Sequence, residues 1–143
     1  MKLGTKNSWV SITVAALISS AFWYAWYSKP FFRNAWLVGN RITFAKIDAQ
    51  METGLGDTVA MTAATYWVLS LGIHYFLEAT RSKSFLQKIG NASVLWALIV
   101  VPVTFFGLLW EFRRLDLMVL DSAHLLAVFL IVASTAHFLN KNS

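Results

Sequence analysis

The sequence predicts an all-α fold, a four-helix transmembrane bundle with up-down-up-down connections. Hydrophobic residues make up 57% of the 143 residues, whereas charged residues make up only 13%. A soluble domain of this size could not bury so much apolar surface, because small proteins keep a large share of their surface in water. Four apolar runs have the length of a membrane span, and their continuity indicates helices rather than barrel strands. We therefore expect one integral membrane domain over residues 1–143.

The first expected span covers residues 8–27 and contains no charged residue. It ends in a run of aromatic side chains. Such rings are typical of the belt that forms where a membrane helix meets the lipid headgroups. The rings assigned to this belt are Trp23, Tyr24, Trp26 and Tyr27.

The connection over residues 28–57 is too long to be a plain turn. Its stretch RITFAKIDAQME places Phe44 and Met51 at helical spacing among charged residues. Two structures stay open for this stretch, a short helix lying on the membrane surface or an irregular loop. The following GLGD, at 54–57, predicts a stop and a new start, with Asp57 as the N-cap of the next span.

The second expected span covers residues 58–80 and contains two ionisable side chains, His74 and Glu78. They lie one helical turn apart on a face that also carries Ala60 and Ala64. Small residues line the interfaces between membrane helices, because they let the backbones approach closely. We therefore expect His74 and Glu78 to point into the bundle.

The third and fourth expected spans cover residues 92–110 and 115–139. Only a short charged turn, Glu111 to Arg114, joins them, which makes the two helices antiparallel neighbours. The charges of this turn predict a local set of ion pairs at the membrane surface, formed by Glu111, Arg113, Arg114 and Asp116.

The polar groups of the spans fall into two layers of different depth. His74, Glu78 and His137 lie toward the side that holds both termini, where two histidines on parallel helices could bind haem or a metal ion. The alternative is that these side chains only sit at the membrane interface. No cofactor is predicted as the first choice, and haem or metal binding stays the weaker alternative.

The second layer holds Asp121 and His124, with Glu111 and Arg113 nearby in sequence. Placing an aspartate inside a span costs about 2.5–3.5 kcal/mol on insertion scales, so such a residue usually has a partner. Three partners stay open for Asp121: His124, a serine or tyrosine of the first helix, or an arginine. The layer could handle protons, bind a ligand, or only fix one helix against another.

Charge and composition exclude several classes of protein. The chain has no cysteine, which removes disulfides and thiolate chemistry. The net charge of +5 is spread over several loops, so nucleic-acid binding is not expected. No nucleophile triad, phosphate loop or paired-carboxylate site is recognisable, and we therefore expect no enzyme. Lysine and arginine are balanced between the two sides, while most acids lie opposite the termini, which favours cytoplasmic termini.

Two stretches resemble the motifs of a known family. WYSKPFFRNAW, after the first span, resembles the pattern WYSP-x-x-F-G-x-x-W of small bacterial four-helix membrane proteins that are catalogued only as a domain of unknown function. The turn resembles its second motif, roughly F-E-x-R-P-L-x-L-F-L-I-D-A-G-Y-H. In this sequence Arg114 replaces the proline, Ala123 replaces the glycine, and His124 stands one position before the family histidine. The second motif is matched at Glu111, Arg113, Leu115, Leu117, Leu120 and Asp121.

The resemblance implies a shared fold in a bacterial inner membrane and names no activity. Three hypotheses remain. The first is a non-catalytic membrane component that self-associates or joins other membrane subunits. The second is a small oligomeric transporter or channel that handles protons or ions at Asp121 and His124, and the third is haem or metal binding through His74 and His137. The first is favoured, because the polar groups form two separated layers rather than one stripe across the membrane.

Overall fold

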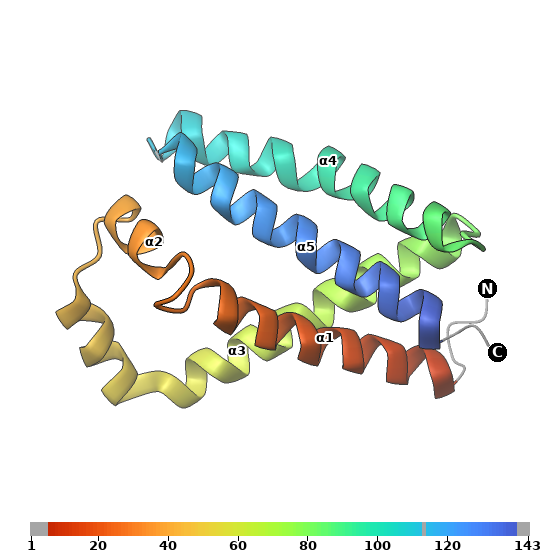
Figure 1. The fold of residues 1–143 in the computed structure, drawn as a ribbon, viewed down its shortest axis with the longest axis horizontal. Coiled ribbons are helices and arrows are strands. Elements are labelled where there is room, and N and C mark those ends of the chain that lie inside the picture. The colour runs from red at the N-terminus through yellow and green to blue at the C-terminus, as the bar shows by residue number, and fades with distance from the viewer. Residues whose placement is uncertain (1–5, 113, 140–143) are drawn as a thin grey trace.

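The fold was analysed in a computed structural model, which describes residues 6–112 and 114–139 (Figure 1). All secondary structure within these residues is helical, which confirms the predicted all-α class. The helices are, in chain order, α1 (Lys6–Trp26), α2 (Arg33–Gly39), α3 (Phe44–Ala79), α4 (Phe85–Trp110) and α5 (Leu115–Leu139).

Three of these helices are long and apolar enough to cross a membrane: Ser8–Trp26, Phe85–Trp110 and Leu115–Leu139, with mean hydropathies of 1.3, 2.3 and 2.1. They correspond to the first, third and fourth expected spans. The second expected span, 58–80, lies within α3 and is not among them. Threonine, serine, tyrosine and histidine side chains in this part of α3 lower its mean hydropathy.

The long helices pack in a defined order. α4 and α5 lie side by side as an antiparallel pair, and α1 packs along the other side of α5 (Figure 1). α3 crosses α1 and approaches α5, while its first part runs away from the other helices. α1 begins, and α5 ends, near the turn between α3 and α4. We call this end the terminal end, and the end that holds α2 and the α4–α5 turn the opposite end.

The break predicted at GLGD is confirmed at Gly54, whereas Asp57 as the N-cap is wrong. α3 begins at Phe44 and continues through this stretch, interrupted only by non-helical backbone at Gly54 (φ −156°, ψ 25°). Thr43 is the N-cap, and its side chain accepts a hydrogen bond from the Lys46 amide at 3.4 Å. Asp57 lies inside the helix and is exposed instead of capping it. The predicted stop and start thus corresponds to the kink at Gly54, and the helix resumes directly after this residue, before Asp57 could cap it.

The long connection also contains α2, which the sequence analysis missed. The Leu37 side chain of α2 is buried, and Gly39 lies directly against Leu117 of α5. A Cβ atom at Gly39 would stand 2.5 Å from the Leu117 Cγ atom. The absence of a side chain at this position therefore lets α2 lie close to the start of α5.

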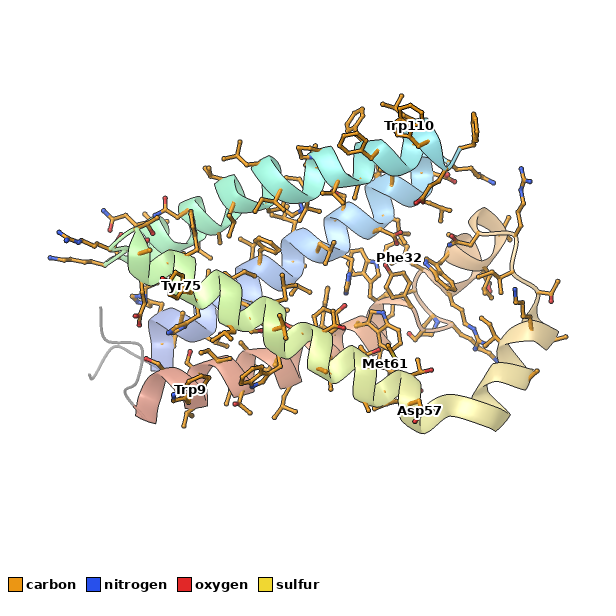
Figure 2. The ribbon with its side chains drawn as sticks, turned by 180° about the vertical axis from the view of Figure 1, so that it is seen from behind. Trp9, Phe32, Asp57, Met61, Tyr75 and Trp110 are labelled. Atoms are coloured by element: carbon orange, nitrogen blue, oxygen red, sulfur yellow. The ribbon has the colours of Figure 1, made fainter. Side chains whose placement is uncertain are left out.

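Apolar and small side chains form the core between the long helices. The main cluster consists of Ala15, Ile73, Leu77, Ala92, Val100, Phe129, Val132, Ala133 and Ala136. Large apolar side chains also cover the outside, as Met61, Tyr75 and Trp110 do in Figure 2. An outer surface of this kind suits contact with lipid.

Candidate functional site

His124 occupies the most enclosed polar position of α5. Only 2% of the residue is exposed. Aromatic rings from α1, from the residue that follows it, and from α3 surround the imidazole. The ring of Phe22 stacks on it at 5.5 Å between centroids with 3° between the planes. The centroids of Tyr27, Trp26 and Tyr66 lie 5.3, 5.8 and 6.1 Å away.

Two hydroxyl groups bring polar contacts to this enclosure. The Tyr27 hydroxyl donates a hydrogen bond of 2.7 Å to Asp121 Oδ1. The Tyr66 hydroxyl lies 3.4 Å from His124 Nε2. Asp121 and His124 are one helical turn apart, so α5 presents both side chains to α1 and α3. We call this set, Phe22, Trp26, Tyr27, Tyr66, Asp121 and His124, the histidine cluster.

The aromatic rings at the end of α1 point in two directions. Tyr24 is exposed over 74% of its surface, as expected for a ring in the aromatic belt. Trp26 and Tyr27 instead turn inward onto His124, and Trp23 packs on Tyr27 at 6.2 Å. The ring of Trp36 from α2 meets Tyr27 edge-on at 5.7 Å, so α2 covers the cluster at the opposite end.

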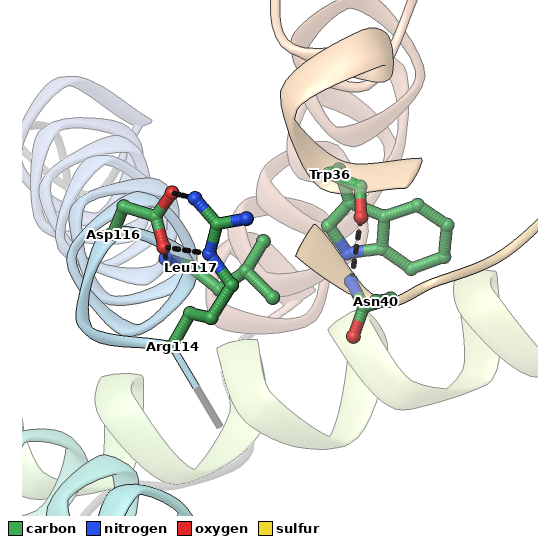
Figure 3. Close-up of polar contacts among 5 residues, drawn as sticks. All are labelled: Trp36, Asn40, Arg114, Asp116 and Leu117. Carbon is green, nitrogen blue, oxygen red and sulfur yellow. Dashed lines mark hydrogen bonds and ion pairs between the residues drawn. The ribbon is translucent and has the colours of Figure 1, made fainter. Parts of the chain in front are cut away.

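The charged turn between α4 and α5 lies at the surface. Arg114 donates two hydrogen bonds to Asp116, of 3.0 and 2.7 Å, and Asp116 Oδ1 also accepts from the Leu117 amide at 3.0 Å (Figure 3). Figure 3 also shows Asn40 bonded to the Trp36 carbonyl at the end of α2. Glu111 is exposed at the end of α4, and Arg113 lies outside the described residues. Of the ion pairs predicted for this turn, the described residues form one, between Arg114 and Asp116.

At the terminal end, His74 and Glu78 form a second polar site. His74 is 2% exposed, and its Nε2 atom lies 3.3 Å from Glu78 Oε1. His137 is half-buried and packs against the rings of Phe85 and Phe138, at 5.4 and 5.2 Å. In residues 6–112 and 114–139, no group of three or more His, Asp or Glu side chains is placed to hold a metal ion. Haem or metal binding through His74 and His137 stays a prediction.

Phe22 and Tyr66 belong to the histidine cluster but were not candidate site residues. Tyr66 precedes His74 by eight residues, which places both on one row of the helix surface. That spacing was the available signal in the sequence. The contact between Phe22 and His124 depends on how α1 rotates against α5, which periodicity within one helix does not determine.

The chemistry of the histidine cluster is that of proton donors and acceptors. A carboxylate, two phenols and an imidazole lie within hydrogen-bonding reach in two pairs, at 2.7 and 3.4 Å. Aromatic rings enclose the imidazole and exclude bulk water from it. Groups of this kind can hold a proton inside a membrane or fix one helix against another.

Comparison with known proteins gives one result. The model of a family described as "Protein of unknown function (DUF1761)" matches residues 10–136. No curated protein and no solved structure matches the chain. The family match includes every residue of the histidine cluster and also His74 and Glu78.

Proposed function

The chain belongs to the family described as a protein of unknown function (DUF1761), and we propose that it is a non-catalytic, self-associating component of a bacterial inner membrane. In this proposal α1, α3, α4 and α5 cross the membrane as a four-helix, up-down-up-down bundle, with both termini in the cytoplasm. Three apolar helices support a membrane location. The packing of α3 against α1 and α5 supports a fourth crossing, because packing shields its polar side chains from lipid.

The proposal of self-association is based on the outer face of α3. Ala60, Ala64, Val68 and Gly72 recur at every fourth residue and are all exposed. Ala64 and Val68, together with Thr65 and Leu69, line an open groove of about 480 Å³. A row of small residues allows a second helix to approach closely, which is how many membrane helices associate. We propose that a second copy of the chain covers this row.

The oligomeric state of the gently solubilised protein tests this proposal. Ala64→Leu fills the groove and should convert an oligomer into a monomer, measured by native mass spectrometry. Ala97→Leu is the matched control, because Ala97 is an exposed alanine on α4, away from the groove. A wild-type protein that stays monomeric at every concentration would contradict self-association. A different membrane protein bound to the same face would also contradict it, since the proposal commits to a second copy.

A second candidate function, proton handling at Asp121 and His124, is favoured by one observation. Both side chains lie within the bundle, and each faces a phenol that can donate or accept a proton. The ¹⁵N resonances of the imidazoles test this function. The His124 signal should respond to the pH of the bulk solution, and His137 at the terminal end serves as the comparison. A His124 resonance that does not change over the pH range of the folded protein would contradict proton handling.

A further inference from the structure

We propose that the inward face of α3 is a proton path that joins the two polar sites. Tyr66, Ser70, His74 and Glu78 recur at every fourth residue of α3, a spacing that stacks side chains along one helix face. The first three residues are buried, whereas the Glu78 side chain is 31% exposed at the terminal end. The path rests on the proton handling proposed for Asp121 and His124, and it extends that function to the other end of the bundle.

Two close contacts between ionisable groups mark the ends of this row. At the terminal end, His74 Nε2 lies 3.3 Å from Glu78 Oε1. In the histidine cluster, the Tyr66 hydroxyl lies 3.4 Å from His124 Nε2. From Tyr66 to Glu78 the helix rises about 18 Å, which is more than half of the hydrocarbon thickness of a bilayer. The two layers that the sequence analysis treated as separate are therefore connected by one helix face.

In the middle of the row, a buried hydroxyl group makes no hydrogen bond. Ser70 Oγ is buried and has no hydrogen-bond partner among the described residues. The same holds for Ser11 Oγ and Ser19 Oγ of α1, the helix that packs along α3. Buried polar groups are nearly always hydrogen-bonded, so these atoms call for a polar occupant.

Other serines of the bundle differ from these three. Ser20, Ser93 and Ser134 donate to the carbonyl four residues earlier, at 2.8, 2.9 and 2.7 Å. That bond is the usual arrangement of a serine within a helix. Free hydroxyls are thus found on the two helices that pack at the proposed path, and they are not a general property of serine in this chain.

Water is the occupant that these groups suit. Side chains four residues apart on a helix are separated by about 6 Å at Cβ, a distance that one bridging water can close. A proton from the terminal side binds Glu78 and passes to His74 Nε2, while the imidazole releases its other proton toward Ser70. Water and the Ser70 hydroxyl pass a proton to Tyr66, and His124 accepts one at Nε2 and releases one toward Asp121. At every step one N–H or O–H bond forms as another breaks. Asp121, which is half-buried, releases the proton at the opposite end, and each imidazole returns to its first tautomer before the next transfer.

Charged neighbours are consistent with a proton entrance at Glu78. Lys88 of α4 interacts with the Glu78 carboxylate, and its ammonium group donates to the Ala136 carbonyl at 2.8 Å. The Glu78 carboxylate thus interacts with both the Lys88 side chain and the buried imidazole of His74. At the other end of the row, Asp121 and Tyr27 are the ionisable groups beside His124.

Proton flux in reconstituted vesicles tests the path. Purified protein is placed in phosphatidylethanolamine–phosphatidylglycerol vesicles that contain a pH-sensitive dye, and valinomycin with a potassium gradient supplies the voltage. Wild-type vesicles should acidify faster than protein-free vesicles. Ser70→Ala should reduce the rate to that of protein-free vesicles without loss of thermal stability, because the hydroxyl forms no hydrogen bond with the described residues. Ser93→Ala is the matched control and should keep the wild-type rate.

Two outcomes would overturn the path. One is an unchanged flux in Ser70→Ala, and the other is a wild-type flux no greater than that of protein-free vesicles. In either case, a His124 resonance that still responds to bulk pH would leave proton handling at the histidine cluster standing. An unresponsive His124 would remove both proposals. The two ideas are therefore separable in one preparation of protein.

Discussion

The Tyr27 hydroxyl donates a 2.7 Å hydrogen bond to Asp121 and so joins the segment that follows α1 to the first third of α5. A carboxylate inside a membrane helix requires such a partner. The contact also holds Tyr27 against His124, whose ring lies 5.3 Å away between centroids. One hydrogen bond thus positions both a carboxylate and part of the aromatic enclosure.

Removal of this hydroxyl should destabilise the bundle. Tyr27→Phe keeps the ring but leaves Asp121 without its phenol donor, and the free energy of unfolding should fall by about 2 kcal/mol. Unfolding in mixed micelles followed by circular dichroism measures the change. Tyr24→Phe, on the exposed side of α1, is the matched control and should have no effect. Equal stability of the two variants would show that the bond to Asp121 contributes nothing.

The close contact between Gly39 and Leu117 gives a second prediction. Gly39→Ala places a methyl group 2.5 Å from the Leu117 side chain, and overpacking of this kind costs about 1–3 kcal/mol. Hydrogen exchange should accelerate in α2. Leu117→Ala in the same chain should restore protection by making room. Gly90→Ala is the control, because nothing lies near that position, and it should raise stability by up to about 1 kcal/mol.

Arg81 offers a stabilising change. It follows α3 in a left-handed conformation (φ 53°), and the Ser82 amide bonds to the Leu77 carbonyl at 3.2 Å, as in a Schellman C-cap. Because a left-handed residue with a Cβ atom is strained by about 1–2 kcal/mol, Arg81→Gly should raise the free energy of unfolding by about 1 kcal/mol. Arg81→Ala retains the strain and separates the backbone effect from the loss of charge. If both variants have the same stability, the gain does not come from the backbone.

The ion pair in the α4–α5 turn should contribute little. The side chains of Arg114 and Asp116 are 57% and 60% exposed, so water and salt screen their attraction. Arg114→Gln should leave the unfolding midpoint unchanged at high and at low salt. Measurement in the same micelles as Tyr27→Phe compares the two contacts directly. A large, salt-dependent loss would show that the turn, and not the buried hydrogen bond, anchors α5.

Apolar composition and run length predicted the helical class and four spans, and three of these spans are apolar helices long enough to cross a membrane. The position of Asp121 inside an apolar span indicated that it needs a partner. A tyrosine of the first helix was one of the partners considered, and Tyr27 is that partner. The GLGD stretch located the break, which lies at Gly54, but it did not locate the start of the next segment, because the backbone resumes helical geometry before Asp57. Local signals do not show whether a helix stops or only bends.

The orientation of α3 shows a further limit of sequence reasoning. Ala60 and Ala64 were placed on the face of His74, yet they are exposed while Tyr66, Ser70 and His74 are buried. Small residues suit either an internal interface or one with another chain, so their presence does not determine which face turns inward. For the same reason, the buried face of α3 that lies between the two predicted polar layers was not recognised in the sequence.

The bond between Tyr27 and Asp121 spans 94 positions of the chain, which has a consequence for biogenesis. A ribosome makes the aromatic end of α1 first and α5 last among the helices. Until α5 packs against α1 and α3, the rings of Tyr66, Trp26 and Tyr27 lack their contacts with His124, and this face of the nascent protein stays uncovered. Tyr27 and Tyr66 thus acquire their contacts with α5 only when the last helix packs.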